Sequence, residues 1–106
     1  MEYELSPVEF NRMLTEDKGE KLYVLDVREI HEWNYYHLEG SHHMPMNTIP
    51  SRLGELPENE TLYVICAHGV RSAVVCEYLL GHGFSDVKSV AGGMAAVSGM
   101  RGFAYD

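Results

Sequence analysis

The chain has 106 residues, of which 45% are hydrophobic, and its formal net charge at pH 7 is −8. A chain of this length can bury one compact core and leaves no room for a second domain of ordinary size, so residues 1–106 are expected to form a single domain. The acidic balance argues against nucleic acid or an anionic membrane surface as a partner, because both bind proteins through broad basic surfaces.

The first half of the chain predicts a helix and then a buried strand. Ser6, followed by Pro7 and Glu9, has the pattern of a capping box and predicts a helix over residues 7–17. Residues 22–27 are apolar almost throughout, which is typical of a parallel strand that is covered on both faces. Shorter pieces follow: an amphipathic segment at 29–35, a loop at 40–45 and a helical turn or two at 49–53.

The second half of the chain repeats this order of strand and helix. Residues 61–66 are as apolar as the first strand and predict a second central one. A helix is expected over 71–80, a further strand over 87–90, and a short last helix after Gly92 and Gly93. Strands that alternate with helices predict an α/β domain with a central, mostly parallel sheet flanked by helices. Sites in such domains form beyond the carboxyl ends of the strands.

The chain has two cysteines, Cys66 and Cys76, and a core of this size does not need a disulfide. Cys76 falls on the apolar face of the predicted helix, so we expect it to pack in the core rather than act as a resolving thiol. The histidines lack the spacing of metal ligands, and no metal is expected. No run approaches the roughly 20 apolar residues of a membrane span, and the first residues do not resemble a signal peptide, so a cytoplasmic protein is expected.

The most informative segment connects the second central strand to the next helix. It reads Cys66-Ala67-His68-Gly69-Val70-Arg71-Ser72. Successive amides in a tight turn that enters a helix can converge on one point and bind an anion there. Gly69 permits a positive φ, Arg71 adds a fixed charge, and Ser72 can cap the helix. If the anion is the sulfur of Cys66, the same field favours a nucleophilic thiolate, although a cysteine that merely packs at a strand end is the alternative.

Polar residues after the first central strand are expected to support this loop. Asp26 ends that strand at the same sheet edge as Cys66, where its carboxylate can accept hydrogen bonds from loop amides. Arg28 and Glu32 are four residues apart, the spacing of neighbours on one helical face, and predict an ion pair. Asp26 and Arg28 are therefore expected to stabilise the site without taking part in the chemistry.

These motifs together resemble the rhodanese-like sulfurtransferases, and specifically their single-domain members. The segment from Cys66 to Arg71 corresponds to the family's six-residue active loop, which begins with cysteine and ends with arginine. Three other motifs match in the family's order: Asp26-Val27-Arg28 with Glu32 and Trp33, then His37-Leu38-Glu39-Gly40-Ser41 with Pro45, then Gly92-Gly93. The resemblance covers most of the chain.

The resemblance implies that Cys66 takes a sulfane sulfur from thiosulfate or a persulfide, holds it as a persulfide, and passes it to cyanide or a thiol. No cofactor is needed, since the cysteine itself carries the transferred group. The implied substrate-binding residues are those of the loop: Ala67, His68, Gly69, Val70, Arg71 and Ser72. The implied partners are a small-molecule donor and acceptor, or a protein persulfide in either role, with the chain a monomer or weak homodimer.

Two departures from the family pattern keep other functions open. Many members carry an arginine or lysine where this chain has Ala67 and His68, so an anionic donor would meet a weaker field. A non-catalytic persulfide carrier or redox-sensing module that acts with a protein partner is therefore an alternative. A small cysteine-dependent phosphatase is less favoured, because related phosphatases have five residues between the cysteine and the arginine, and this chain has four.

Overall fold

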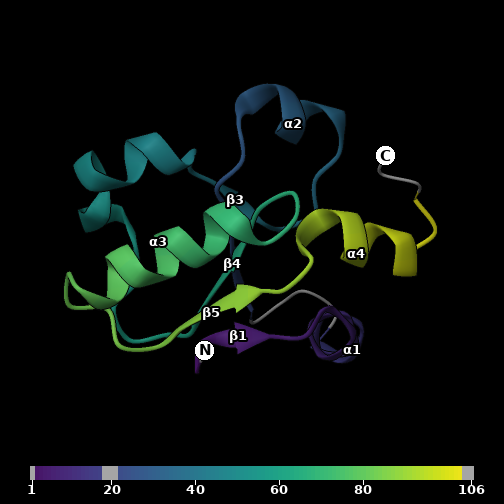
Figure 1. Cartoon of the computed structure of the whole chain (residues 1–106), viewed down its shortest axis with the longest axis horizontal. Coiled ribbons are helices and arrows are strands. Elements are labelled where there is room, and N and C mark those ends of the chain that lie inside the picture. The colour runs from purple at the N-terminus through teal and green to yellow at the C-terminus, as the bar shows by residue number, and fades with distance from the viewer. Residues whose placement is uncertain (1, 18–21, 104–106) are drawn as a thin grey trace.

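The computed structural model describes residues 2–17 and 22–103, which form a five-stranded sheet with helices packed against it (Figure 1). All strand pairs are parallel, and the spatial order is β1-β5-β4-β2-β3. The strands are β1 (Glu4–Leu5), β2 (Tyr23–Asp26), β3 (His42–His43), β4 (Leu62–Ile65) and β5 (Val87–Val90). The helices are α1 (Pro7–Asp17), α2 (Ile30–Tyr35), α3 (Val70–Leu80) and α4 (Gly93–Met100), with 3-10 segments η1 (Met46–Ser51) and η2 (Leu53–Glu55). The predicted α/β fold with a parallel sheet is confirmed.

Each face of the sheet carries its own apolar cluster. On one face, Val64 of β4 packs in a cluster with Cys76 of α3 and with residues of the 3-10 segments. On the other face, Ile65 packs in a cluster with Phe10 of α1 and Met94 of α4. Successive side chains of a strand point to opposite faces, so a strand covered on both sides must be apolar throughout, as β4 is.

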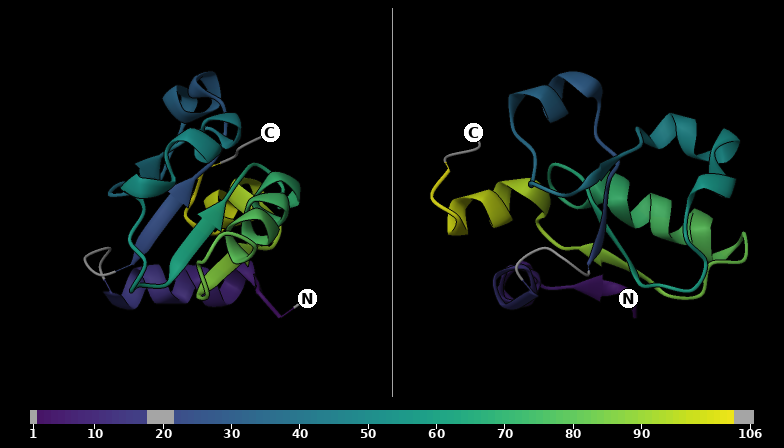
Figure 2. Two further views of the ribbon diagram at one scale, coloured as in Figure 1. Left: turned by 90° about the vertical axis from the view of Figure 1, so that its left-hand side faces the viewer. Right: turned by 180° about the vertical axis from the view of Figure 1, so that it is seen from behind.

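The carboxyl ends of β2 and β4 lie next to each other. Asp26 is the register partner of Ile65, and the amide of Val27 donates to the carbonyl of Ile65 over 3.0 Å. Figure 2 shows the two strands side by side, with α2 beyond their ends. The segment after β2 and the loop after β4 therefore meet at one edge of the sheet, as expected for parallel strands.

Most predicted elements occur close to their predicted bounds. The helix over 7–17 is α1, and the amide of Glu9 donates to Ser6 Oγ over 3.1 Å, as the capping pattern predicts. The strand over 87–90 is β5. The two central strands predicted over 22–27 and 61–66 occur, but each begins one residue later and ends one residue earlier than predicted.

The two outermost strands were not predicted. β1 was missed altogether, and β3 lies inside the predicted loop over 40–45. Each has only two residues, a length over which no side-chain periodicity can be read. The helical turn or two expected over 49–53 occurs as two 3-10 segments, which begin earlier, at residue 46, and end later, at residue 55.

Candidate active site around Cys66

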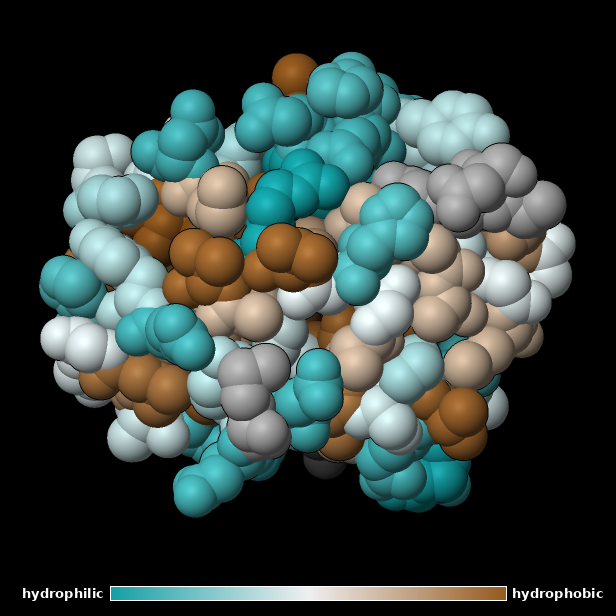
Figure 3. All heavy atoms as spheres, viewed as in Figure 1, coloured by the Kyte–Doolittle hydropathy of each residue, from teal (hydrophilic) through white to brown (hydrophobic). Residues whose placement is uncertain are grey.

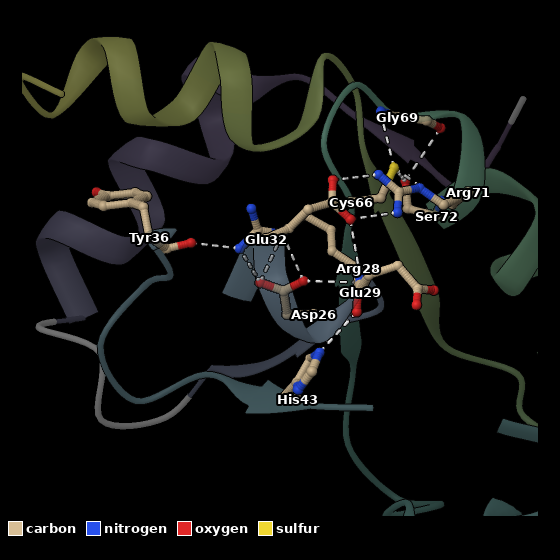
Figure 4. A network of polar contacts seen from close by, with 10 residues as sticks. All are labelled: Asp26, Arg28, Glu29, Glu32, Tyr36, His43, Cys66, Gly69, Arg71 and Ser72. Atoms are coloured by element: carbon tan, nitrogen blue, oxygen red, sulfur yellow. Dashed lines mark hydrogen bonds and ion pairs between the residues drawn. The ribbon is translucent and has the colours of Figure 1, made fainter. Parts of the chain in front are cut away.

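Cys66 follows β4 directly, and backbone amides surround its sulfur. The side chain is buried, with 1% of the residue exposed. Its Sγ accepts hydrogen bonds from the amide of Gly69 over 3.1 Å and from the amide of Ser72 over 3.2 Å (Figure 4). The hydroxyl of Ser72 lies 3.5 Å from the same sulfur. The structure thus brings Cys66, Gly69 and Ser72 together around one atom, in the arrangement that favours a negative charge there.

The remaining predicted loop residues do not place their side chains on the sulfur. Ala67 is buried and its carbonyl accepts a hydrogen bond from the amide of Ala95 over 3.0 Å. His68 is exposed, and Val70 is 73% exposed. His68 and Val70 thus lie on the outside of the loop, while Sγ is contacted by the amides of Gly69 and Ser72 and by the Ser72 hydroxyl.

Ser72 does not cap α3, contrary to the prediction. The helix begins at Val70, and Gly69 is its N-cap with φ 99°, in the left-handed region that glycine adopts readily. Because the glycine turns the chain into the helix earlier, Ser72 lies in the first turn. Its hydroxyl instead donates to the carbonyl of Gly69 over 3.2 Å and lies 2.7 Å from the hydroxyl of Ser89 on β5.

The glycine pair supports the loop from the side of α4. The amide of Met94 donates to the carbonyl of Cys66 over 2.7 Å, and the amide of Ala95 bonds to the next carbonyl of the loop. Gly93 has φ 59°, and a Cβ on it would lie 2.5 Å from the Cys66 carbonyl oxygen. Only glycine lets the start of α4 approach the loop this closely. The sequence identified this glycine pair only as a family motif, and the structure shows why glycine is needed at Gly93.

Arg71 joins the loop to α2. Its Nη1 and Nη2 donate to Glu32 Oε1 and Oε2 over 2.8 and 2.9 Å. Glu32 Oε1 also accepts the amide of Glu29 over 2.9 Å. The hydrogen bonds from Arg71 lower the pKa of Glu32 to about 2, against the opposing effect of burial, so this carboxylate is ionised at neutral pH.

The predicted ion pair of Arg28 with Glu32 is wrong, because each side chain has a nearer partner. Arg28 and Asp26 are both fully buried, and Arg28 Nε and Nη2 donate to the Asp26 carboxylate over 2.9 and 2.8 Å. Nη2 also donates to the carbonyl of Tyr36 over 2.7 Å. A buried charge requires a close opposite charge, and the two residues are placed to supply it to each other.

Asp26 also departs from its predicted contacts. Its carboxylate accepts the backbone amide of Arg28 over 3.1 Å and the Arg28 guanidinium, in place of the amides of the loop after Cys66. The carbonyl of Arg28 in turn bonds to His43 Nε2 over 2.8 Å. The pair therefore supports the site by fixing the segment that leads into α2, and not by touching the loop amides.

Cys76 lies in the interior of α3 and is fully buried, as predicted. Burial raises the pKa of its thiol to about 12, so it remains protonated at neutral pH. Among the residues that the structure describes, no cluster of three or more histidine, cysteine or acidic side chains is placed to hold a metal ion. Over the same ranges, no helix has both the length and the apolar character needed to cross a membrane.

Sequence reasoning missed three contributors to the site. These are the pairing of Glu32 with Arg71, the hydroxyl of Ser89, and the amides at the start of α4. Glu32 and Arg71 are 39 residues apart, and no local pattern links them. The two amides are backbone groups, which leave no signal in a sequence.

Comparison with protein families matches residues 6–100 to the rhodanese-like domain. The chain is 40% identical over 78 residues to the putative sulfur carrier protein YrkF of Bacillus subtilis, covering 74% of this chain and 42% of that protein. It is 37% identical over 83 residues to the putative sulfurtransferase YtwF of the same organism, covering 78% and 80%. The chain spans less than half the length of some of the curated relatives that it matches, YrkF among them.

The fold is also similar to solved structures. The rhodanese-like domain protein from Staphylococcus aureus superposes with a TM-score of 0.81 at 36% sequence identity, and the match covers 89% of each chain.

Proposed function

The chain belongs to the rhodanese-like domain family, and we propose that it transfers a sulfane sulfur through a persulfide on Cys66. The observation that carries this proposal is the pair of amides, from Gly69 and Ser72, that donate to Cys66 Sγ. Two such donors at the start of a helix stabilise a thiolate, and the same donors suit the anionic persulfide that follows. The names of relatives, a sulfur carrier and a sulfurtransferase, agree with it.

In the first step, the Cys66 thiolate attacks the outer sulfur of the donor. With thiosulfate, the Sγ–S bond forms as the S–S bond of thiosulfate breaks, and sulfite leaves with the electron pair. With an alkyl persulfide, the leaving group is the alkyl thiolate. In the second step, cyanide or a thiolate attacks the outer sulfur of the Cys66 persulfide, the S–S bond breaks, and the Cys66 thiolate returns. Charge and electrons balance in each step, so no redox cofactor enters.

The other residues of the site hold the loop in the geometry that these steps need. Gly69 provides the turn, Ser72 links the loop to β5, and Arg71 anchors it to α2. Asp26 and Arg28 fix the segment before α2 as a buried pair. None of these side chains is assigned a proton transfer.

A single-turnover transfer tests the proposal. The protein is incubated with thiosulfate or cysteine persulfide, freed of donor, and given cyanide, and the thiocyanate released is measured. We expect about one thiocyanate per chain, and none from Cys66→Ser, which lacks the nucleophile. Equal release from Cys66→Ser would contradict the proposal.

A carrier that passes sulfur to a protein partner is the second candidate, and the match to the sulfur carrier YrkF favours it. The steady state separates the two candidates. Sustained thiocyanate production with excess thiosulfate and cyanide supports an enzyme, whereas loading without turnover supports a carrier.

A further inference from the structure

Each of the two arginines beside the candidate site has its own carboxylate. Arg28 is fully buried against Asp26, with closest contacts of 2.8 and 2.9 Å. Arg71, the fixed cation of the loop itself, makes two hydrogen bonds to Glu32. Arg71 and Glu32 are 30% and 18% exposed, so this pair lies near the surface while the other lies in the interior. The fixed positive charge at the site is thus balanced by acidic side chains.

The outer side of the loop carries the exposed His68 and, toward α3, an apolar strip. Val70 lies between the sulfur-binding glycine and Arg71 and is 73% exposed, and Val74, one turn further along α3, is 55% exposed. Figure 3 shows apolar side chains gathered over α3 on this face of the molecule. A donor that approaches across Val70 and Val74 meets side chains that attract no anion.

We propose that Glu32 is a specificity-determining residue that, by neutralising Arg71, directs Cys66 toward alkyl persulfides and away from thiosulfate. The inference rests on the proposed function. Thiosulfate carries two negative charges and releases sulfite, which also carries two, so both the approach and the departure depend on a positive potential. An alkyl persulfide carries at most one charge on its sulfur end and releases a thiolate with one. Pairing of Arg71 therefore disfavours thiosulfate more than the persulfide.

Glu32 is placed to have this effect through Arg71 rather than through the sulfur. Glu32 lies on α2, and its carboxylate accepts hydrogen bonds from both terminal guanidinium nitrogens of Arg71. It also accepts a hydrogen bond from the amide of Glu29. Figure 4 shows the pair beside Cys66, with Glu32 on the side of α2. The contact is specific to the loop and can be altered without touching the groups that bind Sγ.

The test uses Glu32→Gln, which keeps the shape and an acceptor for Arg71 but removes the negative charge. Loading of Cys66 is followed by intact mass at several concentrations of thiosulfate and of cysteine persulfide. Wild type is expected to load faster from cysteine persulfide. The variant is expected to raise the second-order rate constant for thiosulfate about five- to tenfold and that for cysteine persulfide by less than about twofold. Added salt should reduce the thiosulfate gain.

The matched control is Glu55→Gln. Glu55 accepts two hydrogen bonds from Arg52, over 3.0 and 2.9 Å, on η2, so this variant removes the same charge and breaks a similar pair outside the loop and α2. It is expected to leave both rate constants within about twofold of wild type. An equal thiosulfate gain in this control would overturn the inference.

Val70→Lys gives an independent check, because it adds a cation at an exposed position of the loop. A thiosulfate gain in Val70→Lys without one in Glu32→Gln would show that charge matters but that Glu32 does not set it, and would overturn the inference. Faster wild-type loading from thiosulfate, or an equal change for both donors in Glu32→Gln, would also overturn it. Failure of Cys66 to load from either donor would instead defeat the proposed function itself.

Discussion

The two cysteines have nearly the same exposure and belong to the same apolar cluster, but they differ in the polar groups around their sulfur atoms. Cys66 is 1% exposed and Cys76 is 0% exposed. The sulfur of Cys66 accepts two amide hydrogen bonds, whereas Cys76 packs among apolar residues, where burial raises the pKa of its thiol to about 12. The comparison shows that exposure does not distinguish a candidate nucleophile from a core residue in this fold. The presence of hydrogen-bond donors does.

The difference follows from position along the chain. Cys66 comes directly after a strand and before a helix, where the first amides of the helix have no partner within it and are available to the sulfur. Cys76 lies in the middle of α3, where the amides bond to carbonyls of the same helix. The position of each thiol along the backbone therefore decides whether amides are available to its sulfur.

The largest expected effect comes from removing the close approach that shapes the Cys66 loop. Gly93→Ala would place a Cβ 2.5 Å from the Cys66 carbonyl oxygen, at a positive φ, and is expected to destabilise the protein by roughly 2–4 kcal/mol. Chemical denaturation measures the loss. Gly99→Ala is the control in the same helix, because a Cβ there would meet nothing within 4 Å, and it should be neutral or stabilising by up to about 1 kcal/mol. Equal stability of the two variants would contradict this role of Gly93.

Replacing Cys76 with serine is expected to lower the stability of the protein without changing the loading of Cys66. Cys76→Ser buries a hydroxyl in an apolar cluster and should cost about 1–2 kcal/mol, measured by urea unfolding. Loading of Cys66 should continue at the wild-type rate in the variant under folding conditions. Cys76→Ala, which introduces no polar atom, serves as the second variant. Loss of loading in both variants would show that Cys76 takes part in the chemistry and would remove the contrast between the two thiols.

Removing the hydroxyl of Ser72 tests whether side chains or backbone amides make the essential contacts with Cys66 Sγ. Ser72→Ala removes the contact with Ser89 but keeps the amide that donates to Sγ, and is expected to cost about 1 kcal/mol in unfolding free energy. Loading of Cys66 should fall by less than about tenfold, since the backbone donors remain. Complete loss of loading in the folded variant would assign the essential contact to the hydroxyl.

The smallest expected effect concerns acid stability. The pKa of Glu32 in the folded protein is about 2, below the value of about 4.3 for an unpaired glutamate. Its ion pair with Arg71 therefore stabilises the fold at pH values above about 4.3. As the pH falls from about 5 toward 2, this contribution is lost. The pair is partly exposed, and the contribution should be under about 1 kcal/mol. The stability difference between wild type and Glu32→Gln should therefore shrink in acid, and a constant difference from pH 7 to pH 2 would contradict the assignment.

Local patterns predicted the parts of the structure that depend on neighbours in sequence. The cap at Ser6 located α1, and the apolar runs located β2 and β4, whose ends place Cys66 at the sheet edge where the candidate site lies. The loop of amides around Cys66 could be foreseen because a strand followed at once by a helix requires a turn with unpaired donors.

Other parts depend on packing between distant segments. The spacing of Arg28 and Glu32 suggested a pair, but the burial of Asp26 and the position of α2 beside the loop gave each a different partner. Because α3 begins at Val70 with Gly69 as its N-cap, Ser72 lies in the first turn and not at the expected cap position. Which partner a side chain pairs with depends on the segments that folding brings next to it, and these cannot be read from local spacing.

The most direct test of the contrast between the two thiols is the intact mass of the protein after incubation with a sulfur donor. Wild type and Cys76→Ala are expected to gain about 32 Da, the mass of one sulfur atom, while Cys66→Ser gains nothing. A gain of one sulfur in Cys66→Ser, or its loss in Cys76→Ala, would contradict the assignment of Cys66 as the sulfur-carrying residue.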